Sequence, residues 1–96
     1  MLASLTIPNT VTKIGRRAFA DCMGLTSVDL PDSITEIGEH AFAGCTGLTS
    51  VTIPARITKF GKLAFSRCVG LTSVSIPDSV KSLIPKNAFA RNTKII

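Results

Sequence analysis

Short stretches of alternating hydrophobic and polar residues recur along the chain. In one of them, Val28 and Leu30 alternate with Ser27 and Asp29, which is the two-residue period of a strand with one buried face. Pro31 follows at once and predicts the end of this strand, because proline has no amide hydrogen to donate. We therefore expect short strands that each turn one face inward and one face toward solvent.

A second hydrophobic spacing follows each of these strands. Ile34 and Ile37 are the expected inward residues of another short extended segment, which Gly38 interrupts. The next residues, 39–43, are compatible with a single helical or 3-10 turn. Phe42 is the largest side chain of the unit, so we expect it to fill the centre of the structure.

This pattern repeats along the chain at a nearly constant step. Each residue type below keeps one place in the unit, although the last phenylalanine comes one place late: Leu2, Leu25, Leu48 and Leu71; Pro8, Pro31, Pro54 and Pro77; Phe19, Phe42, Phe65 and Phe89. A unit of this size does not bury its apolar side alone, so we expect neighbouring units to stack. Equivalent strands then lie about 4.8 Å apart.

The repeat has the length and form of a known class. A step of about 23 residues lies within the range of leucine-rich repeats, and each unit opens with their L-x-x-L-x-L form. The unit L-x-x-V-x-I-P-x-S-I-x-x-I-G-x-x-A-F-x-x-C-x-x-L closely resembles the BspA-type leucine-rich repeat over essentially the whole chain. That resemblance implies a role in binding, and relatives of this type are often cell-surface proteins.

We therefore predict a leucine-rich-repeat solenoid. It is expected to be a right-handed coil of stacked short parallel strands with short helical or 3-10 turns, and mainly β in class. Residues 1–96 are expected to form one domain, with four repeats and the start of a fifth, at 2–24, 25–47, 48–70, 71–94 and 95–96.

The last unit departs from the pattern. It carries one extra residue, replaces the glycine with Ile84-Pro85, and has Asn92 at the cysteine place. Ile95 is expected to take the leucine place of the next unit, with its side chain inward. No separate polar cap is visible at either end, so we expect the terminal turns to be covered by a neighbouring chain or by further repeats.

The charges are expected to alternate when the units stack. One place carries Lys13, Glu36 and Lys59, and another carries Arg16, Glu39 and Lys62. Uncompensated positive charge is expected toward the C-terminal end: Arg67, Lys81, Lys86, Arg91 and Lys94. The formal net charge is +5, which suits an acidic partner. Nucleic acid is not expected, because no exposed aromatic side chain accompanies these cations for base stacking.

Residues able to carry chemistry are sparse. Cys22, Cys45 and Cys68 share one place of the unit, and we expect a stack of buried, reduced thiols rather than a disulfide or a metal site. His40 is the only histidine, and it is expected to be an exposed surface residue without the partners that acid–base catalysis needs. The glycines mark turns and form no phosphate-binding motif. We expect no enzyme activity and no cofactor.

The candidate partner surface combines outward strand positions with C-terminal cations: Ser27, Asp29, Ser50, Thr52, Ser73, Ser75, Lys81, Lys86, Arg91 and Lys94. The expected function is a non-catalytic protein–protein interaction module. The alternative is a small structural subunit, or a fragment of a larger assembly, docked through its ends or its basic C-terminal part. The sequence shows neither a signal peptide nor a transmembrane segment. Either the chain is intracellular as written or it is a piece of something longer, so the compartment stays open.

Overall fold

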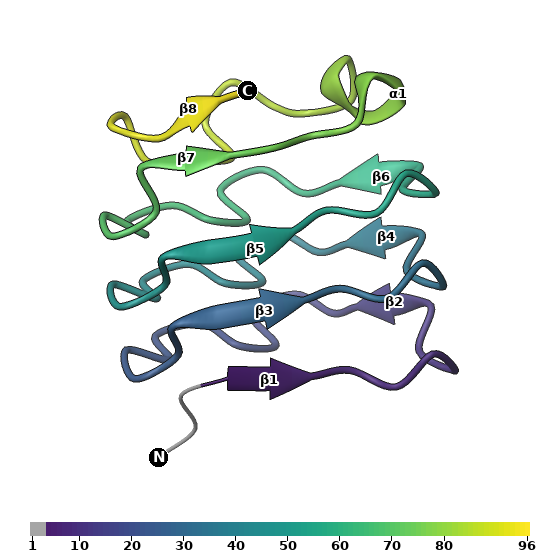
Figure 1. Cartoon of the computed structure of the whole chain (residues 1–96), viewed down its shortest axis with the longest axis horizontal. Coiled ribbons are helices and arrows are strands. Elements are labelled where there is room, and N and C mark those ends of the chain that lie inside the picture. The colour runs from purple at the N-terminus through teal and green to yellow at the C-terminus, as the bar shows by residue number, and fades with distance from the viewer. Residues whose placement is uncertain (1–3) are drawn as a thin grey trace.

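Short parallel strands stack into a coil in the computed structural model, which describes residues 4–96 (Figure 1). One turn of the coil is called a rung below. The first three rungs each hold two strands: β1 (Ser4–Thr6) and β2 (Lys13–Ile14), β3 (Ser27–Asp29) and β4 (Glu36–Ile37), β5 (Ser50–Thr52) and β6 (Lys59–Phe60). The fourth rung holds β7 (Ser73–Val74) and α1 (Asp78–Lys81), and β8 (Lys94–Ile95) begins a fifth.

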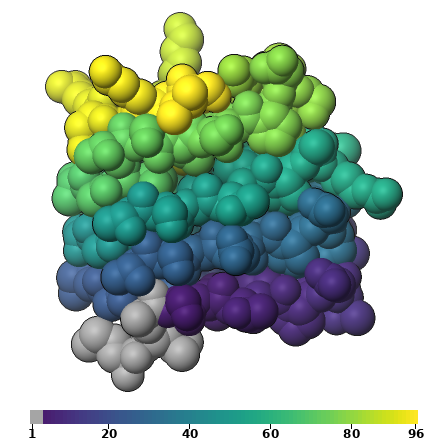
Figure 2. Space-filling model, in the orientation of Figure 1, coloured from purple at the N-terminus to yellow at the C-terminus, as the bar shows by residue number. Residues whose placement is uncertain are grey.

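The strands form parallel sheets on two sides of the coil. β1, β3 and β5 pair in order on one side, β2, β4 and β6 pair on the other, and β7 pairs with β8. In Figure 1 the near strands run to the right and the far strands run to the left while the chain climbs, which makes the coil right-handed. The expected solenoid and its handedness are therefore confirmed, and Figure 2 shows the rungs as stacked bands.

The step between rungs is constant until the fourth rung. Val28 pairs with Leu5 and with Val51, at equal separations in the sequence on either side, as a strict repeat requires. Val74, however, pairs with Ile95, which comes two places earlier than that step would give. Ile95 therefore takes the valine place and not the leucine place that the sequence predicted. Ile95 is 47% exposed, because no further rung covers it within the described residues.

The interior of the coil is apolar throughout the described residues, with no buried polar or charged residue. A stack of phenylalanine rings runs along its axis: Phe19, Phe42, Phe65 and Phe89 have successive centroid distances of 5.2, 5.1 and 5.2 Å. Phe42 and Phe65 are completely buried. Burying a side chain of this kind contributes about 1.5–3 kcal/mol before entropy is counted. The prediction that Phe42 fills the centre is confirmed.

The helical turn expected at residues 39–43 is wrong. His40 has φ +60°, a left-handed conformation that α and 3-10 helices do not contain. Its N–H donates to the carbonyl of Lys62 on the next rung (3.2 Å), and the N–H of Phe42 donates to Ala64 (2.7 Å). Two local bonds also form, from the N–H of Ala41 to Gly38 and from the N–H of Ala43 to His40 (both 3.2 Å), so this segment is a pair of tight turns bonded to the next rung and not a helix. Across residues 4–96 the one helix is α1, where earlier rungs have a tight turn.

The fourth rung leaves the regular stack where Ile84 replaces the glycine of the earlier rungs. A Cβ added at Gly61 would lie 2.4 Å from the backbone of Gly38, and one at Gly38 would lie 2.7 Å from the backbone of Gly15. Glycine is therefore required where these turns approach each other. Ile84 stands at the same place in the fourth rung and brings a Cβ and more. The chain cannot approach the third rung as closely there, and the local path changes.

Candidate binding surfaces

The outward side chains of the β1-β3-β5 sheet, and those at the corresponding places in and just after β7, form an exposed ladder. We call it the hydroxyl face, defined as Ser4, Thr6, Ser27, Asp29, Ser50, Thr52, Ser73 and Ser75. All of these residues are exposed except Ser27, which is half-buried. Strand pairing places Ser27 beside Ser50 and Asp29 beside Thr52, whose Oγ1 donates to Asp29 Oδ1 (3.1 Å).

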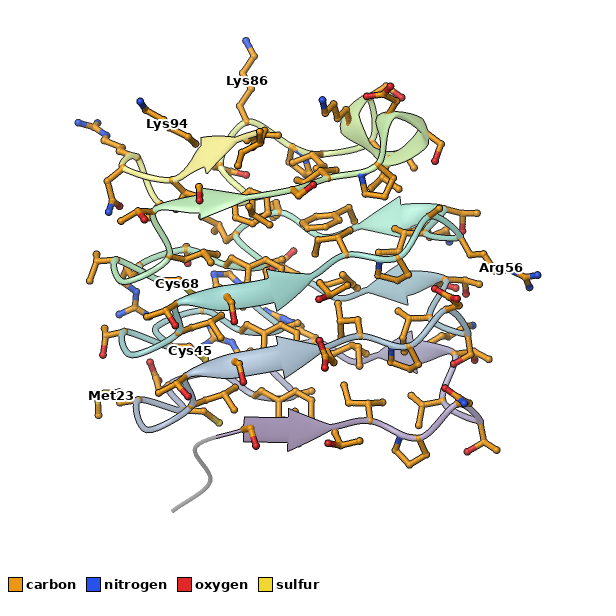
Figure 3. All side chains as sticks on the ribbon, in the orientation of Figure 1. Met23, Cys45, Arg56, Cys68, Lys86 and Lys94 are labelled. Carbon is orange, nitrogen blue, oxygen red and sulfur yellow. The ribbon has the colours of Figure 1, made fainter. Side chains whose placement is uncertain are left out.

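Lys94 joins the hydroxyl face to the C-terminal cations. It pairs with Ser73 across β7 and β8, so its side chain continues the serine column of the face. Figure 3 shows Lys86 and Lys94 projecting from the same end of the coil. The structure thus places the C-terminal cation Lys94 beside the hydroxyl face. The sequence had only suggested that both belong to one partner surface.

An open hollow lies at this end of the coil, with a volume of about 560 Å³. We call it the C-terminal hollow. Lys81, Lys86 and Arg91 line it, and so do the apolar residues Ile84, Phe89 and Ile95. Sequence analysis identified the cations but missed the cavity between them. The signal for it was the substitution of glycine by Ile84, which opens the stack at this point.

Ion pairs between rungs confirm the predicted charge ladders. Lys13 Nζ lies 3.3 Å from Glu36 Oε2, and strand pairing places Glu36 directly beside Lys59. Glu39 Oε1 lies 3.8 Å from Arg16 Nη2, and Glu39 Oε2 lies 3.9 Å from Lys62 Nζ. All of these groups are at least partly exposed, so each pair contributes at most about 1 kcal/mol.

More of the cations toward the C-terminal end are paired with acids than the sequence indicated. Arg67 lies 3.7 Å from Asp21, and Lys81 lies 3.3 Å from Asp78. Asp21 sits far away in sequence, and only the coil brings it near Arg67. Within residues 4–96, Lys86, Arg91 and Lys94 form no ion pair, so they carry the excess positive charge of this end.

His40 is not the exposed surface residue that the sequence suggested. Its side chain is only 20% exposed, and its Nδ1 lies 3.5 Å from Glu39 Oε1. That nitrogen is buried and makes no hydrogen bond within the described structure. Arg17 has the same left-handed backbone at this place of the first rung and is exposed, so the backbone conformation alone does not account for the burial of His40.

The cysteines occupy one place of the repeat, as predicted, and all three are thiols. Cys45 and Cys68 are buried, whereas Cys22 in the first rung is half-buried. Cys45 Sγ donates to the carbonyl of Phe19 (3.3 Å), and Cys68 Sγ donates to that of Phe42 (3.1 Å). Burial raises the pKa of Cys22, and a hydrogen bond with Cys45 together with burial raises the pKa of Cys68.

Residues 4–96 contain no group of three or more histidine, cysteine, aspartate or glutamate side chains placed to hold a metal ion. Nor does any helix in this part of the chain have the length and apolar character needed to cross a membrane.

The fold recurs in solved bacterial proteins. A leucine-rich repeat protein from Bacteroides ovatus shares 35% identity over 93% of this chain, with a TM-score of 0.85, and one from Bacteroides capillosus shares 31% over all of it, with a TM-score of 0.78. A leucine-rich cell surface protein from Faecalibacterium prausnitzii shares 31% identity over 97% of the chain, with a TM-score of 0.58.

All three of these relatives are longer than this chain. It spans 23% of the Bacteroides ovatus protein, 32% of the Faecalibacterium prausnitzii protein and 74% of the Bacteroides capillosus protein. None of the curated proteins compared with the chain matches it significantly. The family model described as a BspA-type leucine-rich repeat region matches residues 1–96. The chain therefore belongs to the BspA-type leucine-rich repeat family.

Proposed function

We propose that this chain is a non-catalytic module that binds another protein, using the hydroxyl face and the cations at its C-terminal end. The observation that carries this proposal is the division between interior and surface. Large apolar side chains occupy the interior of residues 4–96, and no polar residue is buried there. The groups able to make specific contacts lie on the outside, where a stacked array presents an extended surface.

The chemistry of the two surfaces favours a polar and partly acidic partner. The hydroxyl face offers small donors and acceptors in a regular array, without Trp, Tyr or Arg side chains of the kind that anchor tight interfaces. Lys94 extends this face, and Lys86 and Arg91 lie at the same end. The cations are therefore expected to supply electrostatic attraction, and the hydroxyl face to supply additional hydrogen bonds.

Site-specific photo-crosslinking in native extract tests this proposal. A photo-reactive amino acid at Ser50 or at Lys94 is expected to yield a discrete adduct with the same partner, identified by mass spectrometry. The same group at Lys59, which is exposed on β6 in the other sheet, serves as the matched control. Equal adducts from all three positions, or adducts only from Lys59, would contradict the proposed surface.

A second candidate function is a structural segment of a larger protein or assembly. Ile95 and Ile96 are 47% and 67% exposed at the C-terminal end, and Met23 is 66% exposed near the other end. Several solved relatives are also much longer than this chain. In this case native purification should recover the chain at fixed stoichiometry in one assembly, and little of it in free form.

A further inference from the structure

Two thiols lie side by side in the apolar interior of the coil. Cys45 and Cys68 are fully buried, and Figure 3 shows them one above the other on the same side of the coil. They belong to the second and third rungs, each of which has a described rung on both sides, so their surroundings do not depend on either end of the coil. The N–H of Gly44 donates to the carbonyl of Ser66 (2.8 Å), which ties the two rungs together beside the thiols. The two thiols also hydrogen-bond with each other, so a common partner can reach both sulfur atoms.

The arrangement of the cysteines argues against zinc, but it suits a softer ion. A structural zinc site needs four ligands in a tetrahedron, and residues 4–96 hold no group of even three suitable side chains. Thiolates are soft ligands that select Cu(I), and an ion with two collinear bonds needs one sulfur atom on each side. With metal–sulfur bonds of about 2.3 Å, as in zinc thiolates, these atoms lie about 4.6 Å apart. The spacing of neighbouring strands, about 4.8 Å, is nearly the same.

The groups around the two sulfur atoms can hold the negative charge that two thiolates and one Cu(I) ion leave. The backbone N–H of Cys22 donates to the sulfur of Cys45, and the backbone N–H of Cys45 donates to the sulfur of Cys68. Arg67 attracts a thiolate at Cys68. Asp21 repels one at Cys45, but its carboxylate lies 3.7 Å from the guanidinium of Arg67, which offsets this effect. The apolar interior excludes competing water from the site.

We propose that Cys45 and Cys68 bind one Cu(I) ion in linear geometry between the second and third rungs. The thiols release their protons to solvent on binding, and sulfur–metal bonds replace the hydrogen bonds that the thiols donate to backbone carbonyls. Thr46 and Val69, which directly follow the two cysteines, are exposed, so local opening of these loops gives the ion a route from the side of the coil. The bound ion joins two rungs and stabilises the coil. This role is independent of the proposed protein-binding function.

Competition for Cu(I) with the chromophoric chelator bicinchoninate, under anaerobic conditions, tests the proposal on the full chain. The wild-type chain is expected to withdraw one equivalent of Cu(I) and to gain the ultraviolet absorption of a copper–thiolate bond. Zn(II) should bind at least about tenfold more weakly, because two ligands do not complete its tetrahedron. X-ray absorption at the copper edge is expected to find two sulfur neighbours and no nitrogen or oxygen neighbour.

Three matched variants locate the ion, because the same substitution is available at each place of the column. Cys45→Ala and Cys68→Ala are each expected to weaken Cu(I) binding by at least about tenfold. In Cys45→Ala the remaining cysteines lie two rungs apart, about 9.6 Å, which is too far to share one ion. Cys22→Ala is the control and should bind like the wild type. Circular dichroism establishes that each variant is folded. Excess Cu(I) should raise the Tm of the wild type and of Cys22→Ala by about 5 °C or more, and that of the other two variants much less.

Several results would overturn the inference, and some of them need no variant. These are failure of the wild type to withdraw Cu(I) from bicinchoninate, equally tight binding of Zn(II), or nitrogen or oxygen neighbours of the bound copper. Unchanged affinity in Cys45→Ala would place the ion outside the column. A loss in Cys22→Ala as large as that in Cys68→Ala would contradict the assigned pair of ligands. The photo-crosslinks from Ser50 and Lys94 are unaffected by any of these outcomes, so the proposed protein-binding function is tested separately.

Discussion

The three cysteines occupy one position of the repeat but different environments. Cys45 and Cys68 lie inside the stack, where the rungs on both sides exclude solvent, and Cys22 lies half-buried in the first rung. Thiolates are the reactive form of cysteine, and the raised pKa values of Cys22 and Cys68 lower the thiolate fraction at neutral pH. Burial and protonation therefore act in the same direction at Cys68, whereas its hydrogen bond with Cys45 lowers the pKa of Cys45 to about 7.

We expect a thiol reagent to modify Cys22 first and Cys68 much more slowly in the native protein. Because the pKa of Cys22 is raised, its rate should keep increasing as the pH passes the ordinary thiol value of about 8.5. Mass spectrometry after timed labelling measures both rates, and denaturant provides the control in which all three thiols react. Equal native rates for Cys22 and Cys68 would mean that the stack does not protect the inner thiols.

Substitutions of glycine test how closely neighbouring rungs approach each other. A Cβ at Gly38 would lie within 2.8 Å of three backbone atoms in the first rung, whereas a Cβ at Gly15 meets nothing within 4 Å. Gly38→Ala is expected to destabilise the fold by about 1–3 kcal/mol through overpacking. Gly15→Ala is the matched control and should be close to neutral. Chemical denaturation compares the two, and equal losses would show that the close approach at Gly38 is absent.

The sequence predicted well which residues point inward, because its repeated units can be aligned with one another. The inward places of Ile37, Phe42 and Cys45 follow directly from periodicity, and all three residues are buried. His40 was misjudged because its surroundings depend on the neighbouring rung, to which its backbone N–H donates. Such bonding depends on the neighbouring rung and leaves little trace in a single unit of sequence.

At the scale of elements, strand pairing fixes which charges face each other. Glu36 on β4 lies between Lys13 on β2 and Lys59 on β6. We expect Glu36→Lys to destabilise the fold by a few tenths to about 1 kcal/mol at low salt, because three lysines would then stack. The loss should shrink at high salt. Glu36→Gln separates removal of the ion pair from the added repulsion. No loss at low salt would be inconsistent with this pairing.

The elements that sequence did not predict lie in the fourth rung. The extra residue and Ile84-Pro85 indicated a departure there, but they did not reveal its form. The structure of the fourth rung depends on how it packs against the third rung, which the sequence of neither rung shows alone. Ile84 cannot take the glycine place against the third rung, and α1 and the early start of β8 then replace the regular path. The C-terminal hollow is a product of this three-dimensional adjustment, so sequence analysis found its cations without its shape.

At the scale of the whole molecule, both ends of the described coil carry cations beside apolar side chains. In the first rung, Lys13 and Arg16 are paired with Glu36 and Glu39, and Arg17 is exposed. A second hollow of about 360 Å³ lies there, lined in part by Leu5, Phe19 and Met23 and by the acid Asp21. The C-terminal end carries Lys86, Arg91 and Lys94 beside the exposed Ile95 and Ile96. Apolar surface favours end-to-end association of two copies, and like charges oppose it.

We therefore expect association that strengthens with salt. Raising ionic strength screens repulsion between the basic ends and leaves the attraction between apolar groups in place. Sedimentation velocity at several protein concentrations, at about 0.1 M and about 1 M salt, measures the effect. Ile95→Lys/Ile96→Lys should abolish association at both salt concentrations, while Val69→Lys, an exposed apolar residue in a loop of the third rung, serves as the control. A clean monomer under all conditions would show that the ends do not attract each other.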